Sequence, residues 1–562
     1  MKRDPAQLAN GRYDLLVVGS GIHGACIAWD ATLRGLSVAL IERGDFGQET
    51  SANSLKTVHG GLRYLQDADL NLVRTMIQER TSYLNIAPHL VHPLPCLTPT
   101  YSRLMKSRMV MGAALKLNDL AGYDRNRVPD PEKFIPPSEL FSRQECLGVL
   151  PGLADEGVTG GALWHDAQIY DTERLTLSFV LSAAKSGAVV ANYVEAVGFL
   201  KDGNIVRGIE ARDTLSGEQF DIMAKVVVNA AGPWVDNVLE NLKSRSREKK
   251  FNHSLAINIV THKLIDGYAV GTPSWPNKKT RDDKDGQVSH MLFISPWRNH
   301  SLIGTFHSHY RGIPDEFIFN EEQLENILSE VNSAYPGAEL QLEDITYVHR
   351  GFLPEKNDSN VGEVRLVRKG RIFDHNKEDG IHGLITVVGV KYTTARKVAE
   401  QAVDLVFKHL GSEPPDSKTQ ITQLHNGQIE RFDHFLSMAM EMDATQISPA
   451  AIDHLVRTYG SDYATLRELI GNNDEGIPLD PNANQIVQAQ VIHAINEEMA
   501  VRLSDFILRR SGLGSTGRPE ENSLQMSADV MANELKWDEN KRDNEIDEVR
   551  TVYNQLGLRE RM

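Results

Sequence analysis

Residues 13–42 constrain the fold more than any other part of the chain. They read YDLLVVGSGIHGACIAWDATLRGLSVALIE, which predicts an apolar strand, a glycine turn, a helix and a second strand that ends in an acid. Gly19, Gly21 and Gly24 have the spacing of a dinucleotide-binding turn. Gly19 allows the tight turn, Gly21 lets a pyrophosphate approach the backbone, and Gly24 lets the helix pack closely on the strand. The helix N-terminus then offers free N–H groups to phosphates, and Glu42 is placed to bind ribose hydroxyls.

The turn alone does not separate FAD from NAD, but the next segment does. Residues 49–65 read ETSANSLKTVHGGLRYL. This segment resembles its counterpart in the aerobic, quinone-linked type of FAD-dependent glycerol-3-phosphate dehydrogenase. The resemblance implies that a Thr/Ser-rich loop meets the flavin diphosphate and that HGGLRYL passes beside the isoalloxazine ring.

Three later segments extend the resemblance over nearly the whole chain. VVVNAAGPWVD at 226–236 resembles the second flavin motif of that family, and LITVVGVKYTTAR at 384–396 resembles its closing motif. Residues 496–514 resemble part of its C-terminal helical domain. The fingerprint and these motifs together predict FAD bound by Gly19, Ser20, Gly21, His23, Gly24, Glu42, Arg43, Thr50, Ser51, Ser54, Ala231, Gly389, Lys391, Tyr392 and Thr393.

We therefore expect an α/β protein with three domains. A discontinuous, doubly wound FAD-binding domain is predicted at 1–90, 155–240 and 346–412, because these segments combine apolar strands, glycine turns and helices. An antiparallel-sheet substrate or cap domain is predicted at 91–154 and 241–345, and an all-helical domain at 413–562. The clearest helices are predicted at 172–186, after Asp171, at 448–460 and at 484–511.

Composition restricts the partners and the compartment. The 562 residues carry a formal net charge of −16, which argues against a nucleic-acid ligand. The three cysteines stand far apart without a CxxC pair, as is usual in a reducing compartment. No secretion signal and no run of about 18 apolar residues is present. We expect a cytoplasmic protein; peripheral contact with the inner face of the cytoplasmic membrane and a homodimer are left open.

Two residues are candidates for the chemistry. Lys391 follows the Gly389 turn at a predicted helix start, where the helix dipole disfavours a surface lysine. In the family, the matching lysine lies beside flavin and substrate. His59 is a candidate acid/base or hydrogen-bond donor, because histidine titrates near neutral pH. Its alternative role is a structural hydrogen bond within the loop.

The predicted substrate is a small anion, and four arginines are candidates to bind it. Arg63 lies in HGGLRYL, and Arg368 and Arg371 lie in the region of the family's second substrate arginine. The family's phosphate-binding arginine falls on Leu353 here, so Arg350, three residues earlier, is the substitute candidate. The strands at 255–260 and 304–309 also depart from the family pattern. His307 and His309 lie in the second of them, and two histidines are too few for a metal site, so no metal is expected.

The predicted activity is oxidation of sn-glycerol 3-phosphate to dihydroxyacetone phosphate by hydride transfer to FAD, with electrons passed to quinone or another acceptor. One alternative is oxidation of a different anionic hydroxy compound, an amine or an amino acid, because related flavin oxidases share this fold. Another is a flavin-binding regulator with little turnover, against which Lys391 and His59 argue.

Overall fold

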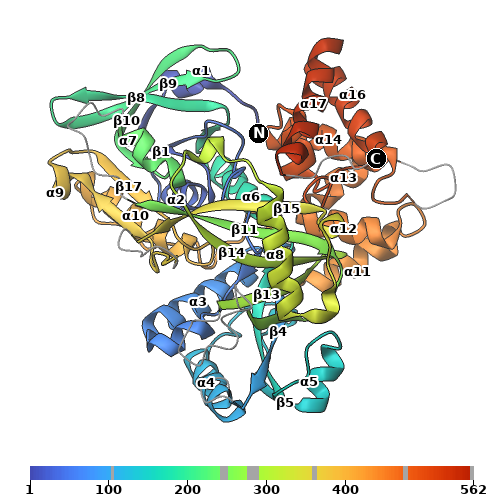
Figure 1. The fold of residues 1–562 in the computed structure, drawn as a ribbon. Coiled ribbons are helices and arrows are strands. Elements are labelled where there is room, and N and C mark those ends of the chain that lie inside the picture. The colour runs from blue at the N-terminus through green and yellow to red at the C-terminus, as the bar shows by residue number, and fades with distance from the viewer. Residues whose placement is uncertain (103–106, 241–250, 275–289, 357–363, 472–478, 557–562) are drawn as a thin grey trace.

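The computed structural model describes residues 1–102, 107–240, 251–274, 290–356, 364–471 and 479–556. Within these residues the chain forms two β-sheets and a C-terminal group of helices (Figure 1). This arrangement confirms the predicted fold class.

The first sheet is the predicted nucleotide-binding sheet. Its strand order is β16-β17-β10-β1-β2-β7, and β17, β10, β1, β2 and β7 run parallel. The antiparallel strands β8 and β9 extend it from β10. The strand bounds are Arg12–Val18 (β1), Val38–Ile41 (β2), Val189–Ala191 (β7), Val194–Asp202 (β8), Ile205–Asp213 (β9), Gln219–Asn229 (β10), Arg371–Asp374 (β16) and Leu384–Val388 (β17).

Both faces of this sheet are covered. On one face lie α2 (Ile22–Leu33), α6 (Thr172–Lys185) and α10 (Ala395–His409), which share a core with β1, β10 and β17. The other face packs against α1 (Pro5–Asn10), α7 (Val235–Glu240) and the β8–β9 hairpin. Helix α6 starts after Asp171 as predicted, and α10 starts at Ala395, a short turn beyond Lys391.

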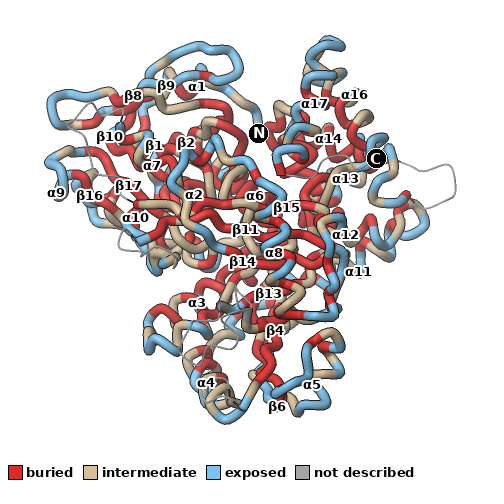
Figure 2. The backbone as a smooth tube through the Cα atoms, in the orientation of Figure 1, coloured by how far each residue is buried: buried red, intermediate tan, exposed pale blue. Residues whose placement is uncertain are grey.

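The second sheet is antiparallel except where β12 meets β4. Its order is β15-β11-β14-β13-β12-β4-β6-β3, with β5 beside β6. Its central strands, such as β11 and β14, are buried (Figure 2). The bounds are Thr57–Val58 (β3), Val91–Tyr101 (β4), Glu139–Ser142 (β5), Val158–Ile169 (β6), Asn252–His262 (β11), Ala269–Ser274 (β12), His290–Trp297 (β13), His300–Tyr310 (β14) and Tyr347–Glu355 (β15).

This sheet includes strands that the sequence analysis grouped with the FAD-binding segments. Strands β3, β6 and β15 come from 1–90, 155–240 and 346–412, yet they pair within the second sheet. A buried apolar strand has the same residue pattern in either sheet, so only the pairing shows where it belongs. The predicted FAD-binding segment 1–90 therefore contributes a strand, β3, to the second sheet.

The remaining helices surround these sheets. They are α3 (Leu70–Ile86), α4 (Arg108–Ala121), α5 (Arg143–Val149), α8 (Glu321–Ala334) and α9 (His375–Asp379). The C-terminal helices are α11 (Phe432–Asp443), α12 (Pro449–Tyr459), α13 (Tyr463–Ile470), α14 (Asn484–Glu498), α15 (Leu503–Asp505), α16 (Glu521–Leu535) and α17 (Glu539–Gln555). Among the described residues, no helix combines the length and the apolar character needed to cross a membrane.

The predicted long helix at 484–511 is wrong. Helix α14 ends at Glu498, because Met499 takes a left-handed conformation with φ of 57°. The chain re-forms as α15 and then as a π-helical turn over Phe506–Arg510. The sequence predicts Arg509 and Arg510 in the last turn of that long helix, where the helix dipole favours cations, but they lie in the π-helical turn instead. They are buried, and they face the FAD-binding domain.

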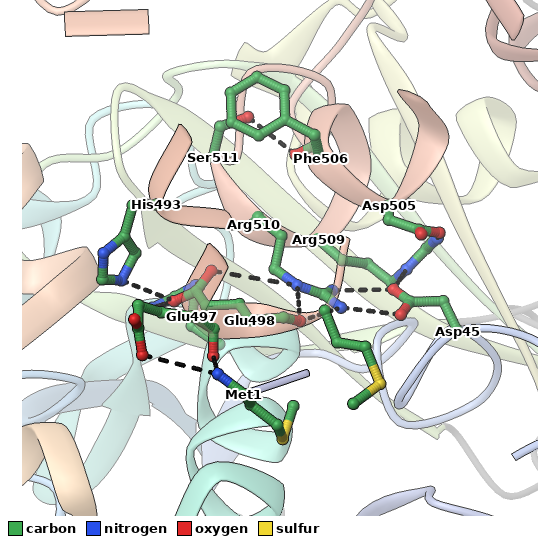
Figure 3. A network of polar contacts seen from close by, with 12 residues as sticks. Met1, Asp45, His493, Glu497, Glu498, Asp505, Phe506, Arg509, Arg510 and Ser511 are labelled. Carbon is green, nitrogen blue, oxygen red and sulfur yellow. Dashed lines mark hydrogen bonds and ion pairs between the residues drawn. The ribbon is translucent and has the colours of Figure 1, made fainter. Parts of the chain in front are cut away.

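A buried ionic network joins the C-terminal helices to that domain (Figure 3). Asp45 lies just beyond β2, and its Oδ1 and Oδ2 accept hydrogen bonds from Arg510 at 2.8 Å each. Arg509 Nε donates to Asp45 Oδ2 at 2.5 Å. Arg174 of α6 pairs with Glu498 at 2.7 Å in the same interface. These paired charges fix the C-terminal region against the nucleotide-binding sheet.

Candidate functional site

A cavity opens at the carboxyl ends of β1, β2, β10 and β17, where ligands bind in open parallel sheets. Its volume is about 2270 Å³, larger than the roughly 300–1,000 Å³ of a pocket for one small molecule. It therefore has room for a dinucleotide and a second ligand. The predicted cofactor residues on its wall are Gly19, Gly21, His23, Glu42, Arg43, Thr50, Ser51, Ser54, Ala231, Gly389, Lys391, Tyr392 and Thr393.

The glycine turn has the close packing that the fingerprint requires. A Cβ atom on Gly24 would lie 1.9 Å from the Gly19 carbonyl oxygen, so no larger residue fits between helix and strand. Gly24 is thus a packing residue and not part of the cavity wall. At the start of α2, the Ile22 N–H donates to Ser51 Oγ at 2.9 Å. Ser51 therefore holds the Thr/Ser-rich loop against the helix N-terminus.

Glu42 lies on the cavity wall at the end of β2, as predicted. Its carboxylate accepts hydrogen bonds from the Ser20 N–H at 2.8 Å and the Gly44 N–H at 3.1 Å. Burial raises the pKa of Glu42, and these hydrogen bonds oppose that rise. Ser20 is buried behind Glu42, and it orients the carboxylate from outside the cavity wall.

A buried polar atom indicates what kind of ligand the cavity fits. His23 Nε2 is buried and has no hydrogen-bond partner among the described residues. Burial lowers the pKa of His23 to about 4, so its ring is neutral. A polar ligand at the start of α2 would supply the missing partner. Together with Glu42 and the glycine turn, this unpaired atom fits a bound dinucleotide.

The HGGLRYL segment forms a sharp turn against the closing motif. Gly61 has φ of 84°, a left-handed conformation that favours glycine, and the 3₁₀ helix Leu62–Asp67 follows it. The His59 N–H donates to Thr393 Oγ1 at 3.2 Å. The two motifs, which are more than 300 residues apart in the chain, thus meet on the cavity wall.

Three of the predicted cations also meet there. Arg63, Arg368 and Lys391 all line the cavity. The Lys391 ammonium donates to the Arg368 carbonyl and lies 5.1 Å from the centre of the Tyr64 ring. Burial, followed by the charges of Arg63, Arg368 and Lys369, lowers the pKa of Lys391 to about 8. The cavity wall that carries His59 thus also carries three cationic side chains, one of which, Arg368, is paired with Asp67.

Two predicted substrate arginines lie outside this cavity. The Arg350 guanidinium donates to the Pro314 carbonyl at 3.4 Å and lies 5.8 Å from the centre of the Phe317 ring. Arg371 lies 4.8 Å from the Phe373 ring. Neither residue is on the cavity wall. Arg350 is therefore absent from the part of the wall that Leu353, at the family's arginine position, lines.

The departures from the family pattern lie together on the cavity wall. Leu353, Asn258 and Thr305 all line it, and Thr305 Oγ1 donates to Asn258 Oδ1 at 2.7 Å. Nearby, His309 Nδ1 lies 2.6 Å from a Glu355 carboxylate oxygen. The described residues contain no group of three or more metal-ligand side chains.

Two residues of the cavity wall were missed by the sequence analysis. Trp234 stacks under the Arg43 guanidinium at 4.3 Å, and it belongs to the VVVNAAGPWVD motif that was noticed only as a whole. Asp166 lies 3.0 Å from His59 and is buried in β6. The signal for Asp166 was a single acid within the apolar segment GALWHDAQI.

Residues 14–396 match the FAD dependent oxidoreductase family, and residues 417–542 match the C-terminal domain of alpha-glycerophosphate oxidase. Together with the two-sheet fold, the glycine turn and the cavity, this match defines the protein as an FAD-dependent oxidoreductase. FAD is accordingly the cofactor.

The relatives define the family more narrowly. A glycerol-3-phosphate dehydrogenase of Synechocystis is 32% identical over 91% of this chain and 90% of its own length. An aerobic glycerol-3-phosphate dehydrogenase of Staphylococcus aureus is 30% identical over 90% of this chain and 87% of its own. The crystal structure of the Bacillus halodurans glycerol-3-phosphate dehydrogenase with FAD superposes with a TM-score of 0.76 at 25% identity, covering 99% of this chain and 98% of that one. The chain belongs to the FAD-dependent glycerol-3-phosphate dehydrogenase family.

Proposed function

We propose that this enzyme oxidises sn-glycerol 3-phosphate to dihydroxyacetone phosphate. The observation that carries the proposal is the cluster of Arg63, Arg368 and Lys391 beside His59 in the FAD cavity. A phosphate carries about −1.5 to −2 charges near neutral pH and is bound best by such donors. When bound, FAD accepts the hydride that leaves the alcohol carbon.

The cations have different surroundings, and we assign them different roles. Arg63 makes no hydrogen bond or ion pair within the described part of the chain, and we propose that it binds the phosphate. Arg368 is paired with Asp67 at 3.0 Å, so it contributes to the positive potential while its own charge is partly compensated. Lys391, the most buried of the three, stabilises negative charge that develops at the reacting centre.

The cofactor residues are assigned by the same reasoning. Glu42 accepts hydrogen bonds from the ribose, and the N–H groups at the start of α2 bind the diphosphate together with Ser51. The same part of the cavity is lined by Arg43, Thr50, Ser54 and Ala231. The Arg43 guanidinium stacks on the Trp234 ring. The Gly389 turn and Thr393 face the part that also holds His59.

The test is anaerobic bleaching of the bound flavin by a panel of substrates. We expect glycerol 3-phosphate to bleach the visible absorbance of the flavin faster than glycerol, lactate or amino acids do. Amines and amino acids are included in the panel because an uncharged side chain, Leu353, replaces the family's arginine. Bleaching by an amine with none by glycerol 3-phosphate would refute the proposal.

We further propose a quinone as the electron acceptor and peripheral contact with the membrane that carries it. Support comes from helix α4, on which Met109, Leu120 and nearby Tyr123 are 78%, 70% and 72% exposed. The exposed cations Arg108 and Lys116 lie on the same helix, as in helices that bind a lipid surface.

Co-sedimentation with vesicles of mixed neutral and anionic lipid tests this contact. Replacing Met109 and Leu120 by Ser should release the protein without a change in flavin reduction by substrate. Exposed Ile421, far from α4 in the sequence and 73% exposed, provides a matched control for lost apolar surface. If the Met109/Leu120 variant sediments with the vesicles as fully as the Ile421 control and the wild type, α4 is not the membrane-contact surface.

A further inference from the structure

A buried carboxylate holds one ring nitrogen of His59. Asp166 Oδ2 lies 3.0 Å from His59 Nδ1, and Asp166 Oδ1 accepts the Gly60 N–H at 2.6 Å and Arg80 NH1 at 3.3 Å. The side chains of Asp166 and Arg80 are only 5% and 1% exposed, whereas that of His59 is 38% exposed and lines the cavity. His59 therefore lies between a buried carboxylate and the ligand cavity.

The protonation of this pair follows from its surroundings. Burial alone would raise the pKa of Asp166, but the hydrogen bonds and charges of His59 and Arg80, with the Gly60 N–H, outweigh burial and lower that pKa. Asp166 is thus a carboxylate and can only accept a hydrogen bond. His59 Nδ1 must then carry the proton, which leaves the lone pair of a neutral His59 on Nε2.

We propose that Asp166 is the positioning residue that makes His59 the base of the oxidation, with Nε2 as the accepting atom. This inference rests on the alcohol oxidation proposed above. The substrate hydroxyl gives its proton to His59 Nε2, and the carbon gives its hydride to FAD, so that the C–OH group becomes C=O. The resulting imidazolium is stabilised by the Asp166 carboxylate.

Gly60 is part of the same arrangement. A Cβ atom at this position would lie 2.4 Å from Arg80 NH1 and 3.1 Å from Asp166 Oδ1. Only a glycine lets the backbone N–H reach Oδ1 while Arg80 stays beside it. The residue that follows His59 therefore fixes which oxygen of Asp166 is left for the histidine.

This geometry makes Asp166→Asn an informative variant. The Gly60 N–H and Arg80 donate hydrogen bonds to the amide oxygen of the new side chain, so its NH₂ group faces His59 Nδ1. Nδ1 then becomes an acceptor and the ring proton moves to Nε2, where it blocks proton uptake. We expect kcat to fall by about 10²-fold or more, the contribution typical of a general base. FAD content and the affinity for a non-oxidisable anionic analogue should stay unchanged.

Two further measurements separate positioning from a merely structural role. If Asp166 acts through His59, the double variant with His59→Gln should be no slower than His59→Gln alone. In Asp166→Asn, kcat should fall while KM for glycerol 3-phosphate stays near the wild-type value, because the change removes proton uptake and not substrate binding. Among the described residues, the ionisable groups around the pair include Arg80, the buried Cys96 thiol and His165, which precedes Asp166 in β6. Arg63 and Lys391 lie on the cavity wall that His59 lines.

Asp124→Asn is the matched control. Asp124 is also a carboxylate paired with an arginine of α3, Arg74, at 2.5 Å, but it lies away from the cavity wall. We expect normal kcat for it. An Asp166→Asn enzyme with wild-type kcat, or losses that add fully to those of His59→Gln, would overturn the inference. A wild type that no secondary alcohol reduces would instead refute the proposed function.

If Asp166→Asn fails to fold, NMR of the wild-type protein can still test which ring nitrogen of His59 carries the proton. In protein labelled with ¹⁵N-histidine, the His59 signals are assigned by their loss in His59→Gln. The nitrogen chemical shifts then report which ring atom carries the proton at high pH. A proton on Nδ1 supports the inference, and a proton on Nε2 overturns it.

Discussion

Replacing Arg510 by Met should destabilise the enzyme more than any change to a surface ion pair. Arg510 is fully buried, and it makes two hydrogen bonds of 2.8 Å to Asp45 and two longer ones to the Glu498 carbonyl. Removing one partner of a buried pair typically costs about 3–5 kcal/mol, because the other charge stays buried. Arg509 and Asn192 still bind Asp45, so we expect the lower end, about 3 kcal/mol.

The assay is urea unfolding, followed by flavin fluorescence as FAD is released and by tryptophan fluorescence. Linear extrapolation of the transition that releases FAD gives the change in the free energy of unfolding. Arg550→Met is the control, because Arg550 also pairs with two carboxylates, Glu521 and Asp547, but at the surface. We expect at most about 1 kcal/mol from the control. Equal losses in the two variants would refute the reasoning that burial, and not the number of ion pairs, sets the cost.

Further variants test the site. Gly21→Val should abolish FAD retention, measured by the 450 nm absorbance usual for a flavin, because the branched side chain points to Ser51 Oγ and the space of the diphosphate; a yellow variant would contradict this. Lys391→Ala should keep FAD and lose about 10²-fold in rate. Since the pKa of Lys391 is lowered to about 8, its charge is present below that pH and lost above it, so the rate of flavin reduction should fall above pH 8 in the wild type but not in Lys391→Arg. Arg63→Ala should raise KM about 10- to 100-fold, as for a lost charged hydrogen bond, whereas Arg350→Ala, outside the cavity, should leave KM unchanged; the reverse pattern would return Arg350 to the substrate site.

The local elements were predictable because neighbouring residues determine them. The strand, glycine turn and helix at 13–42 form as the spacing indicates, with Gly24 packed against the Gly19 carbonyl. Asp171 precedes α6, and Ser448 caps α12 by accepting the Ala451 N–H. Glu42 also lies where its distance from the turn predicts, at the end of β2. In each case, the start or end of the element depends on residues close in sequence.

The tertiary structure decided what depends on residues far apart in sequence. The sequence suggests that Arg509 and Arg510 are cations at a helix end. In the structure both are buried and donate hydrogen bonds to Asp45, which is more than 460 positions away. Arg350 looks like a substitute for a missing arginine, but its guanidinium donates to the Pro314 carbonyl and is not on the cavity wall. Asp166 carries no motif, and it becomes relevant only because β6 brings it within 3.0 Å of His59. The sequence by itself determined the cofactor and the turn that binds it, whereas the pairing of strands and the partners of buried charges determined which ionisable groups meet at the site.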